Sequence, residues 1–111
     1  MDLINKIISN SLDESFEVLK LMTNDDEFIS SLTNASEKIL NTFKSNGKVL
    51  LAGNGGSAAD CQHIAAEFIG RLNFDRNPLP AIAMTANTSN LTCIANDYGY
   101  EDIFVRQMEG L

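Results

Sequence analysis

Apolar residues recur every three or four positions through the first part of the chain, the spacing that places side chains on one face of an α-helix. The pattern predicts a first helix from about Asp2 to Met22. Polar residues at 24–27 are typical of a helix start, and apolar spacing of the same kind then continues to Phe43. The Asn-Gly pair at 46–47 predicts the end of this second helix. We therefore expect residues 1–46 to form a helical hairpin.

The pattern changes at Lys48. The short apolar run 49–52 predicts a buried parallel strand, because strands covered on both faces lack polar alternation. A tight turn is expected at 53–57, followed by a helix from Ser57 to about Gly70. A second buried strand is predicted at 81–84.

Further helices are expected at about residues 90–95 and from Glu101 onward. Alternating strands and helices are typical of an α/β domain with a parallel sheet and right-handed crossovers. Two strands make a poor sheet by themselves, and the last segment stops in mid-pattern. We therefore expect residues 47–111 to be the first part of a longer domain. The alternative is a small α/β protein that completes its sheet by oligomerising.

Composition narrows the class of protein. The 111 residues suit one domain, and 44% apolar with 21% charged residues is typical of a globular chain. The net charge of −7 argues against a nucleic-acid partner, although backbone N–H groups can still bind a small anion. No apolar run approaches the roughly 20 residues of a membrane helix, and no signal peptide is recognisable. We expect Cys61 and Cys93 to be buried, reduced thiols of a cytoplasmic protein.

The turn Gly53–Ser57 lies between a strand and a helix, where open α/β sheets bind ligands. Glycines let the backbone approach an anion, and the N–H groups at a helix start favour phosphate. The turn matches neither the GxGxxG dinucleotide loop nor the Walker loop. A compact turn in which Ser57 caps the helix is the alternative.

His63 and Glu67 are four residues apart on the predicted helix, so their side chains share one face. An imidazole and a carboxylate so placed can share a divalent metal or form an acid/base site. An ordinary surface pair is the alternative. His63 is the chain's only histidine, so a zinc site needs further ligands from elsewhere.

Two other polar positions are candidates. Asn96 and Asp97 lie in a predicted turn and together offer donors and acceptors to sugar hydroxyls, or serve as capping residues. Arg71 follows the predicted helix and can bind a carboxylate or phosphate, or remain a solvated cation at the helix end.

Together these segments resemble the phosphoheptose isomerases of the sugar-isomerase (SIS) family. The resemblance is carried by AGNGGSAADCQHIAAEFIGRL, by PAIAM and by TCIANDYGYEDIFVRQMEGL. It implies a flavodoxin-like three-layer α/β/α sandwich around a parallel sheet, with N-terminal helices that pack between subunits of a homotetramer. It also implies a cytoplasmic enzyme that converts sedoheptulose 7-phosphate to D-glycero-D-manno-heptose 7-phosphate through an enediol. That reaction is the first step of heptose-nucleotide biosynthesis for lipopolysaccharide or capsule.

The resemblance also assigns roles to residues. His63 and Glu67 would be ligands of one zinc ion, and Glu67 would also transfer the proton. The residues expected to contact the phosphosugar are Asn54, Gly55, Gly56, Ser57, Glu67, Arg71, Asn96 and Asp97. The family's remaining parts, a Ser/Thr-rich phosphate loop and a Gln and a His that complete the zinc site, have no counterpart in these residues. We therefore expect this chain alone to be inactive.

Two other functions are compatible with parts of the pattern. A related, non-enzymatic branch of the family binds the bacterial replication initiator, but it lacks a carboxylate at the position of Glu67. The presence of Glu67 therefore favours the isomerase. A phosphosugar-sensing module without catalysis is a third possibility.

Overall fold

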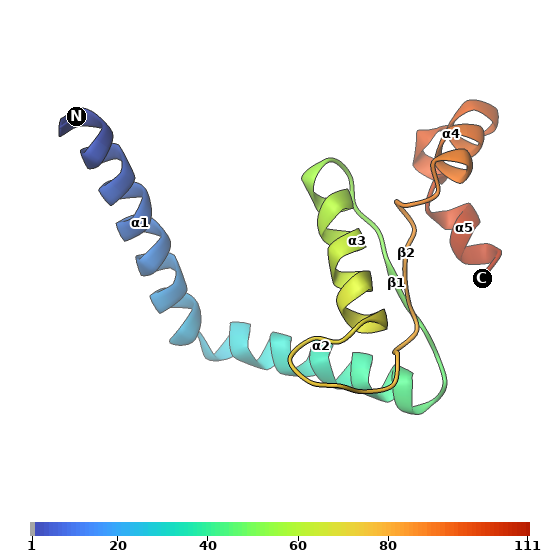
Figure 1. The fold of residues 1–111 in the computed structure, drawn as a ribbon, viewed down its shortest axis with the longest axis horizontal. Helices are drawn as coiled ribbons and strands as arrows, with labels where there is room; N and C mark the ends of the chain where they lie inside the picture. The colour runs from blue at the N-terminus through green and yellow to red at the C-terminus, as the bar shows by residue number, and fades with distance from the viewer. Residues whose placement is uncertain (1) are drawn as a thin grey trace. The chain divides into compact units, whose positions relative to one another are not determined.

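Two long helices, α1 (Asp2–Thr23) and α2 (Asp26–Lys44), begin the chain in the computed structural model, which describes residues 2–111 (Figure 1). Residue 1, the first of the predicted helical segment 1–46, lies outside the described residues. The Asp25 carboxylate accepts a hydrogen bond from the Phe28 N–H at 3.0 Å and so caps α2. Asn46, with φ 58°, ends α2, and the Gly47 N–H donates to the Thr42 carbonyl at 2.8 Å. Both predicted helices, and the predicted end of the second helix at residues 46–47, are confirmed.

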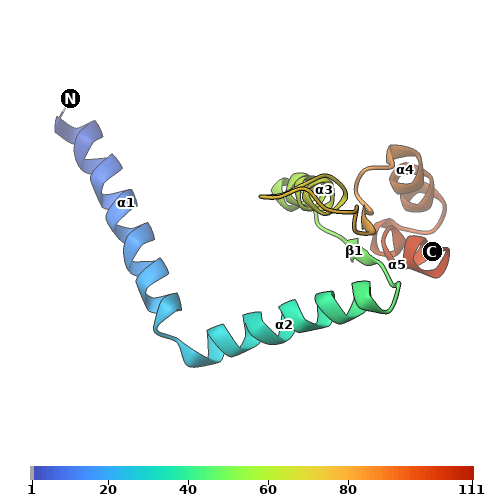
Figure 2. The same cartoon turned by 60° about the horizontal axis from the view of Figure 1, so that its bottom comes forward.

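The apolar faces of these two helices remain exposed. Neither helix contains a buried residue in the part of the chain described, and the exposed fraction is 61% for Ile4 and 64% for Phe16. The predicted hairpin is therefore wrong in its packing: α1 and α2 diverge from the connecting turn rather than lying against each other (Figures 1 and 2). Periodicity predicts a helix and its apolar face, but it does not say what covers that face.

The second part of the chain is built on two short parallel strands. Strand β1 (Val49–Leu51) pairs with β2 (Ala81–Ala83), in the register that sets Leu50 beside Ile82. Helix α3 (Gly56–Ile69) is the crossover between them and packs against both strands. The predicted parallel α/β arrangement is confirmed.

Helix α4 (Thr88–Asp97), the short 3-10 helix η1 (Tyr100–Asp102) and α5 (Val105–Glu109) complete the chain. Figures 1 and 2 both show α3 on one side of the strand pair and α4 and α5 on the other. This is the layering expected of part of an α/β/α sandwich.

The core of this second part is small. Its buried apolar residues are Cys61, Ala65, Ala81, Met84 and Ile103. The predicted burial of β1 is wrong, because all three of its residues are half-exposed in a sheet of only two strands. Cys93 is also exposed, contrary to the prediction, whereas Cys61 is buried as expected. Among residues 2–111, no helix combines the length and apolar character that a membrane span requires.

The chain divides into two compact units, Met1–Leu40 and Asn41–Leu111. Every predicted site residue lies in the second unit.

Candidate functional site

The glycine turn leads directly from β1 into the first turn of α3. Gly55 is the residue before the helix, with φ 59° and ψ −124°, a conformation that side-chain-bearing residues rarely adopt. The Ser57 N–H donates to the Asn54 carbonyl at 3.1 Å, so Ser57 lies inside the helix. The alternative in which Ser57 caps α3 is therefore wrong. No side chain caps this helix; the Ser57 and Ala58 N–H groups donate to backbone carbonyls of the turn, whereas the Gly56 N–H has no partner among the described residues and is available to an anion.

Gly56 leaves open space at the start of α3. A Cβ atom built at this position would meet no atom within 4 Å, and the residue does not need the left-handed conformation that Gly55 adopts. Packing within this chain therefore gives no reason for glycine at position 56. A ligand that approaches the backbone closely would give one.

A small cavity of about 110 Å³ lies beside the turn. Its lining includes the turn itself, Ala58 of α3, the buried Thr85 and Tyr100 of η1. The Thr85 hydroxyl donates to the Ala58 carbonyl at 3.1 Å, and the Tyr100 hydroxyl donates to the Asn54 side-chain oxygen at 2.7 Å. These bonds join the turn and the first part of α3 to segments far along the chain. Sequence reasoning missed Tyr100, because only the fold brings it beside Asn54.

His63 and Glu67 face each other on α3, as their spacing predicts. The His63 Nε2 atom lies 3.2 Å from a carboxylate oxygen of Glu67, and their side chains are 77% and 39% exposed. Both groups are therefore accessible to a ligand. Imidazole nitrogen and carboxylate oxygen are ordinary zinc ligands, so the pair fits part of a zinc site. Residues 2–111 hold no group of three or more potential His, Cys, Asp or Glu ligands, so the pair does not form a complete site.

Arg76 fixes the end of α3 that carries Glu67. Its guanidinium donates to the carbonyl oxygens of Glu67 and Phe68, each at 2.7 Å. These are two of the carbonyls that a helix end leaves without an intrahelical partner. The only sequence signal for this role is an arginine soon after the helix, and it does not distinguish Arg76 from Arg71. Arg71 is exposed and forms no hydrogen bond or ion pair with the other described residues.

Asn96 and Asp97 lie in the last turn of α4, and the Asn96 amide donates to the Asp97 carboxylate at 2.8 Å. Both are exposed and neither has a recorded bond to the glycine turn. The connection between their segment and the turn is made by Tyr100. Nearby, the Arg106 guanidinium lies 3.7 Å from the centre of the Tyr98 ring.

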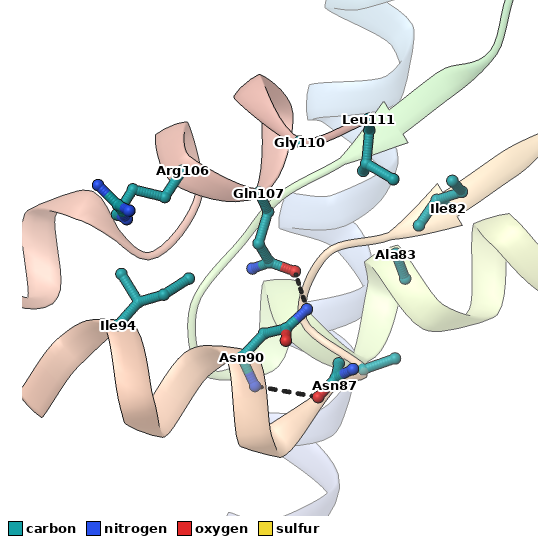
Figure 3. Close-up of a pocket in the computed structure, with 10 residues that line it drawn as sticks. Ile82, Ala83, Asn87, Asn90, Ile94, Arg106, Gln107, Gly110 and Leu111 are labelled. Atoms are coloured by element: carbon teal, nitrogen blue, oxygen red, sulfur yellow. Dashed lines mark hydrogen bonds between the residues drawn. The ribbon is translucent and has the colours of Figure 1, made fainter. Parts of the chain in front are cut away.

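A larger hollow of about 470 Å³ lies between the end of β2, α4 and α5 (Figure 3). The amide side chains that line this hollow form hydrogen bonds within the chain. The Asn87 side chain accepts from the Asn90 N–H at 3.0 Å and caps α4. The Gln107 amide donates to the carbonyls of Met84 and Ile103 at 3.0 and 2.7 Å. The hollow contains none of the predicted site residues, and its polar groups hold α4 and α5 in place.

Several known proteins are similar to this chain in both sequence and fold. Residues 14–110 match the model of the SIS domain family. The chain is 49% identical over 104 residues to the phosphoheptose isomerase of Burkholderia pseudomallei (strain K96243), covering 94% of this chain and 53% of that protein. It is 46% identical over 109 residues to phosphoheptose isomerase 2 of Campylobacter jejuni, covering 98% of this chain and 54% of that protein.

Two solved structures agree with these matches. The phosphoheptose isomerase of Neisseria gonorrhoeae has a TM-score of 0.85 and 35% identity, over 97% of this chain and 54% of that one. The enzyme from Francisella tularensis has a TM-score of 0.83 and 32% identity, over 100% of this chain and 56% of that one. The chain thus spans about half the length of the relatives it matches.

Proposed function

The chain belongs to the SIS domain family, and from this premise we propose that it supplies the N-terminal half of a phosphoheptose isomerase. The reaction is the conversion of sedoheptulose 7-phosphate to D-glycero-D-manno-heptose 7-phosphate. One observation carries the proposal: α3 combines an uncapped, glycine-led N-terminus with an accessible His63–Glu67 pair. An anion site and a pair suited to proton or metal chemistry therefore lie on one helix, as a phosphosugar isomerase requires. The similar proteins of Burkholderia pseudomallei and Campylobacter jejuni, both named phosphoheptose isomerases, support the same reaction.

The glycine turn binds the phosphosugar in this proposal. The backbone at Gly55, Gly56 and Ser57 approaches the anion, and the Asn54 amide contacts the substrate. The open space at Gly56 supports this role, because nothing in the chain fills it. Arg71, Asn96 and Asp97 help to hold the sugar; this part rests on the family resemblance, since the structure records no contact between them and the turn.

His63 and Glu67 would hold one zinc ion, with the remaining ligands supplied by the part of the protein that this chain does not contain. Zinc, when bound, supplies a positive charge beside the sugar oxygens that become negative during the reaction. The facing nitrogen and oxygen atoms of the pair support this assignment.

Glu67 moves the proton. Converting the ketose to the aldose requires a proton to leave C1 and a proton to arrive at C2, through an enediol. The Glu67 carboxylate is 39% exposed and lies on the same helix as the proposed substrate turn, so it is open to a ligand. The Arg76 guanidinium binds the Glu67 backbone carbonyl and so stabilises the last turn of α3, which carries Glu67.

The exposed apolar faces of α1 and α2 support a homotetramer in which these helices pack between subunits. In this proposal the enzyme is cytoplasmic and performs the first step toward a heptose nucleotide for lipopolysaccharide or capsule.

The test is the reaction itself. The full-length protein, loaded with zinc, is incubated with sedoheptulose 7-phosphate in D₂O and the products are followed by NMR. We expect the heptose 7-phosphate to form with solvent deuterium at C2, because the proton passes through a group that exchanges with water. Glu67→Gln is the matched control. A folded, zinc-loaded wild-type protein that forms no product would overturn the proposal.

A further inference from the structure

We propose that Tyr100 is a positioning residue for the substrate turn: its hydroxyl holds the Asn54 side-chain oxygen, so that the Asn54 amide N–H₂ group is presented to the phosphosugar. This inference rests on the proposed function and deepens it. No site residue expected from the sequence has this role.

The first argument is the geometry of one hydrogen bond. The Tyr100 hydroxyl donates to Asn54 Oδ1 at 2.7 Å, which is the usual distance for a strong O–H···O bond. An amide carries one acceptor oxygen and one donor N–H₂ group on opposite sides of a planar group. Fixing the oxygen therefore fixes the direction in which the N–H₂ group points.

The second argument is what remains free at Asn54. Among residues 2–111 the bond from Tyr100 is the one hydrogen bond of the Asn54 side chain, so its N–H₂ group has no acceptor within the described residues. Asn54 is exposed, directly before the φ 59° residue Gly55. Without Tyr100 the amide would be free to rotate in water. With Tyr100, the donor is already oriented when the ligand arrives.

The third argument is how firmly Tyr100 is anchored. The chain reverses after α4 at Gly99, whose φ of 129° is rarely accessible to other residues. The Asp102 N–H then donates to the Gly99 carbonyl at 3.2 Å, and Ile103, only 2% exposed, fixes the end of η1 in the core. The Tyr100 ring is largely exposed, but the backbone that carries it is tied to the core on its C-terminal side. This anchoring keeps the ring beside the turn, where its hydroxyl bonds to Asn54.

The experiment compares two tyrosines of one segment in the full-length enzyme. Tyr100→Phe removes only the hydroxyl, and we expect KM for sedoheptulose 7-phosphate to rise about 2- to 12-fold, the range of one net hydrogen bond, with kcat within about 2-fold of wild type. Tyr98→Phe is the control, because the Tyr98 ring contacts Arg106 and no bond to the turn is recorded for its hydroxyl. We expect it to leave KM unchanged. A lower kcat at constant KM for Tyr100→Phe would indicate lost folded enzyme and would overturn the proposal.

A double-mutant cycle tests whether Tyr100 acts through Asn54. In the Asn54→Ala background, Tyr100→Phe should change KM by less than about 2-fold, because the group it orients is gone. An undiminished effect in that background would overturn the inference, since Tyr100 would then act without Asn54.

A substrate-free measurement separates this inference from the proposed function. Nitrogen-15 relaxation of the Asn54 side-chain amide should show an ordered group in wild type and in Tyr98→Phe, and a mobile one in Tyr100→Phe. If wild type fails to isomerise the heptose phosphate, the proposed function fails, but this result still decides whether Tyr100 holds Asn54. Equal amide mobility in wild type and Tyr100→Phe would overturn the inference even in an active enzyme.

Discussion

Residues 2–40 contain no buried apolar side chain, whereas residues 41–111 bury a small core. In the first unit the helices follow from local signals, and side chains such as Ile8, 52% exposed, are left without cover. In the second unit Ile103 is 2% exposed, and hydrogen bonds such as Tyr100 to Asn54 and Thr85 to Ala58 join residues 46 and 27 positions apart. The first unit therefore exposes the apolar faces of its helices, whereas the second unit has a buried core beside the candidate site. In the proposed function, this difference corresponds to assembly by the first unit and chemistry by the second.

The largest expected effect lies at the site. Glu67→Gln keeps the size of the side chain and removes its charge, so the full-length enzyme should lose about 10²–10⁴-fold in turnover, the usual contribution of a general base. His63→Ala removes a ligand and leaves the carboxylate, so zinc should partly restore its turnover. The measurement is isomerase activity of both variants across a zinc titration. Near-normal activity of Glu67→Gln at saturating zinc would show that another residue moves the proton.

The next effect lies in the first unit and should appear in assembly rather than chemistry. Ile8→Asp places a charge on the exposed apolar face of α1, and burying one such apolar side chain contributes roughly 1.5–3 kcal/mol per subunit. Light scattering should show that the proposed tetramer of the full-length protein dissociates in this variant at micromolar concentration. Asn10→Asp adds the same charge at a polar position of α1 and should leave the tetramer intact. A monomeric wild type, or a tetrameric Ile8→Asp variant, would contradict the division of roles.

A smaller effect is expected at the glycine turn. Gly56→Val puts a β-branched side chain into space that is empty in this chain, so the fold should survive while the phosphosugar loses its close approach. Calorimetry should show affinity for sedoheptulose 7-phosphate reduced more than about 10-fold, roughly 1.4 kcal/mol. Ala66→Val, at an exposed position later in α3, is the control for a β-branched residue in this helix and should bind normally. Unchanged binding by Gly56→Val would mean that the turn has only a structural role.

The same comparison explains which features the sequence predicts. Helices α1 and α2, the presence of both strands and the placement of His63 beside Glu67 depend on spacing along the chain. Each of these structural predictions is confirmed. The packing of α1 on α2 and the burial of β1 depend on partners that local periodicity does not specify. Tyr100 and Arg76 were missed for the same physical reason: each acts on a residue that only the fold brings close. The roles of Arg71, Asn96 and Asp97 remain predictions from the family resemblance.

The smallest effect compares two side-chain N-caps, one in each unit, whose hydrogen bonds have the same length. Asp25 accepts from the Phe28 N–H and Asn87 accepts from the Asn90 N–H, both at 3.0 Å. Replacing either residue with alanine should lower the free energy of unfolding by about 1 kcal/mol. Asn87→Ala should do so equally at all protein concentrations, since α4 belongs to the unit with its own core. Asp25→Ala weakens a helix whose apolar face is covered by other subunits in the proposed tetramer, so its cost in unfolding free energy should grow as the full-length protein is diluted toward dissociation. Denaturant titrations of both variants at two protein concentrations measure this, and the same concentration dependence for both would show that the two units are not stabilised in different ways.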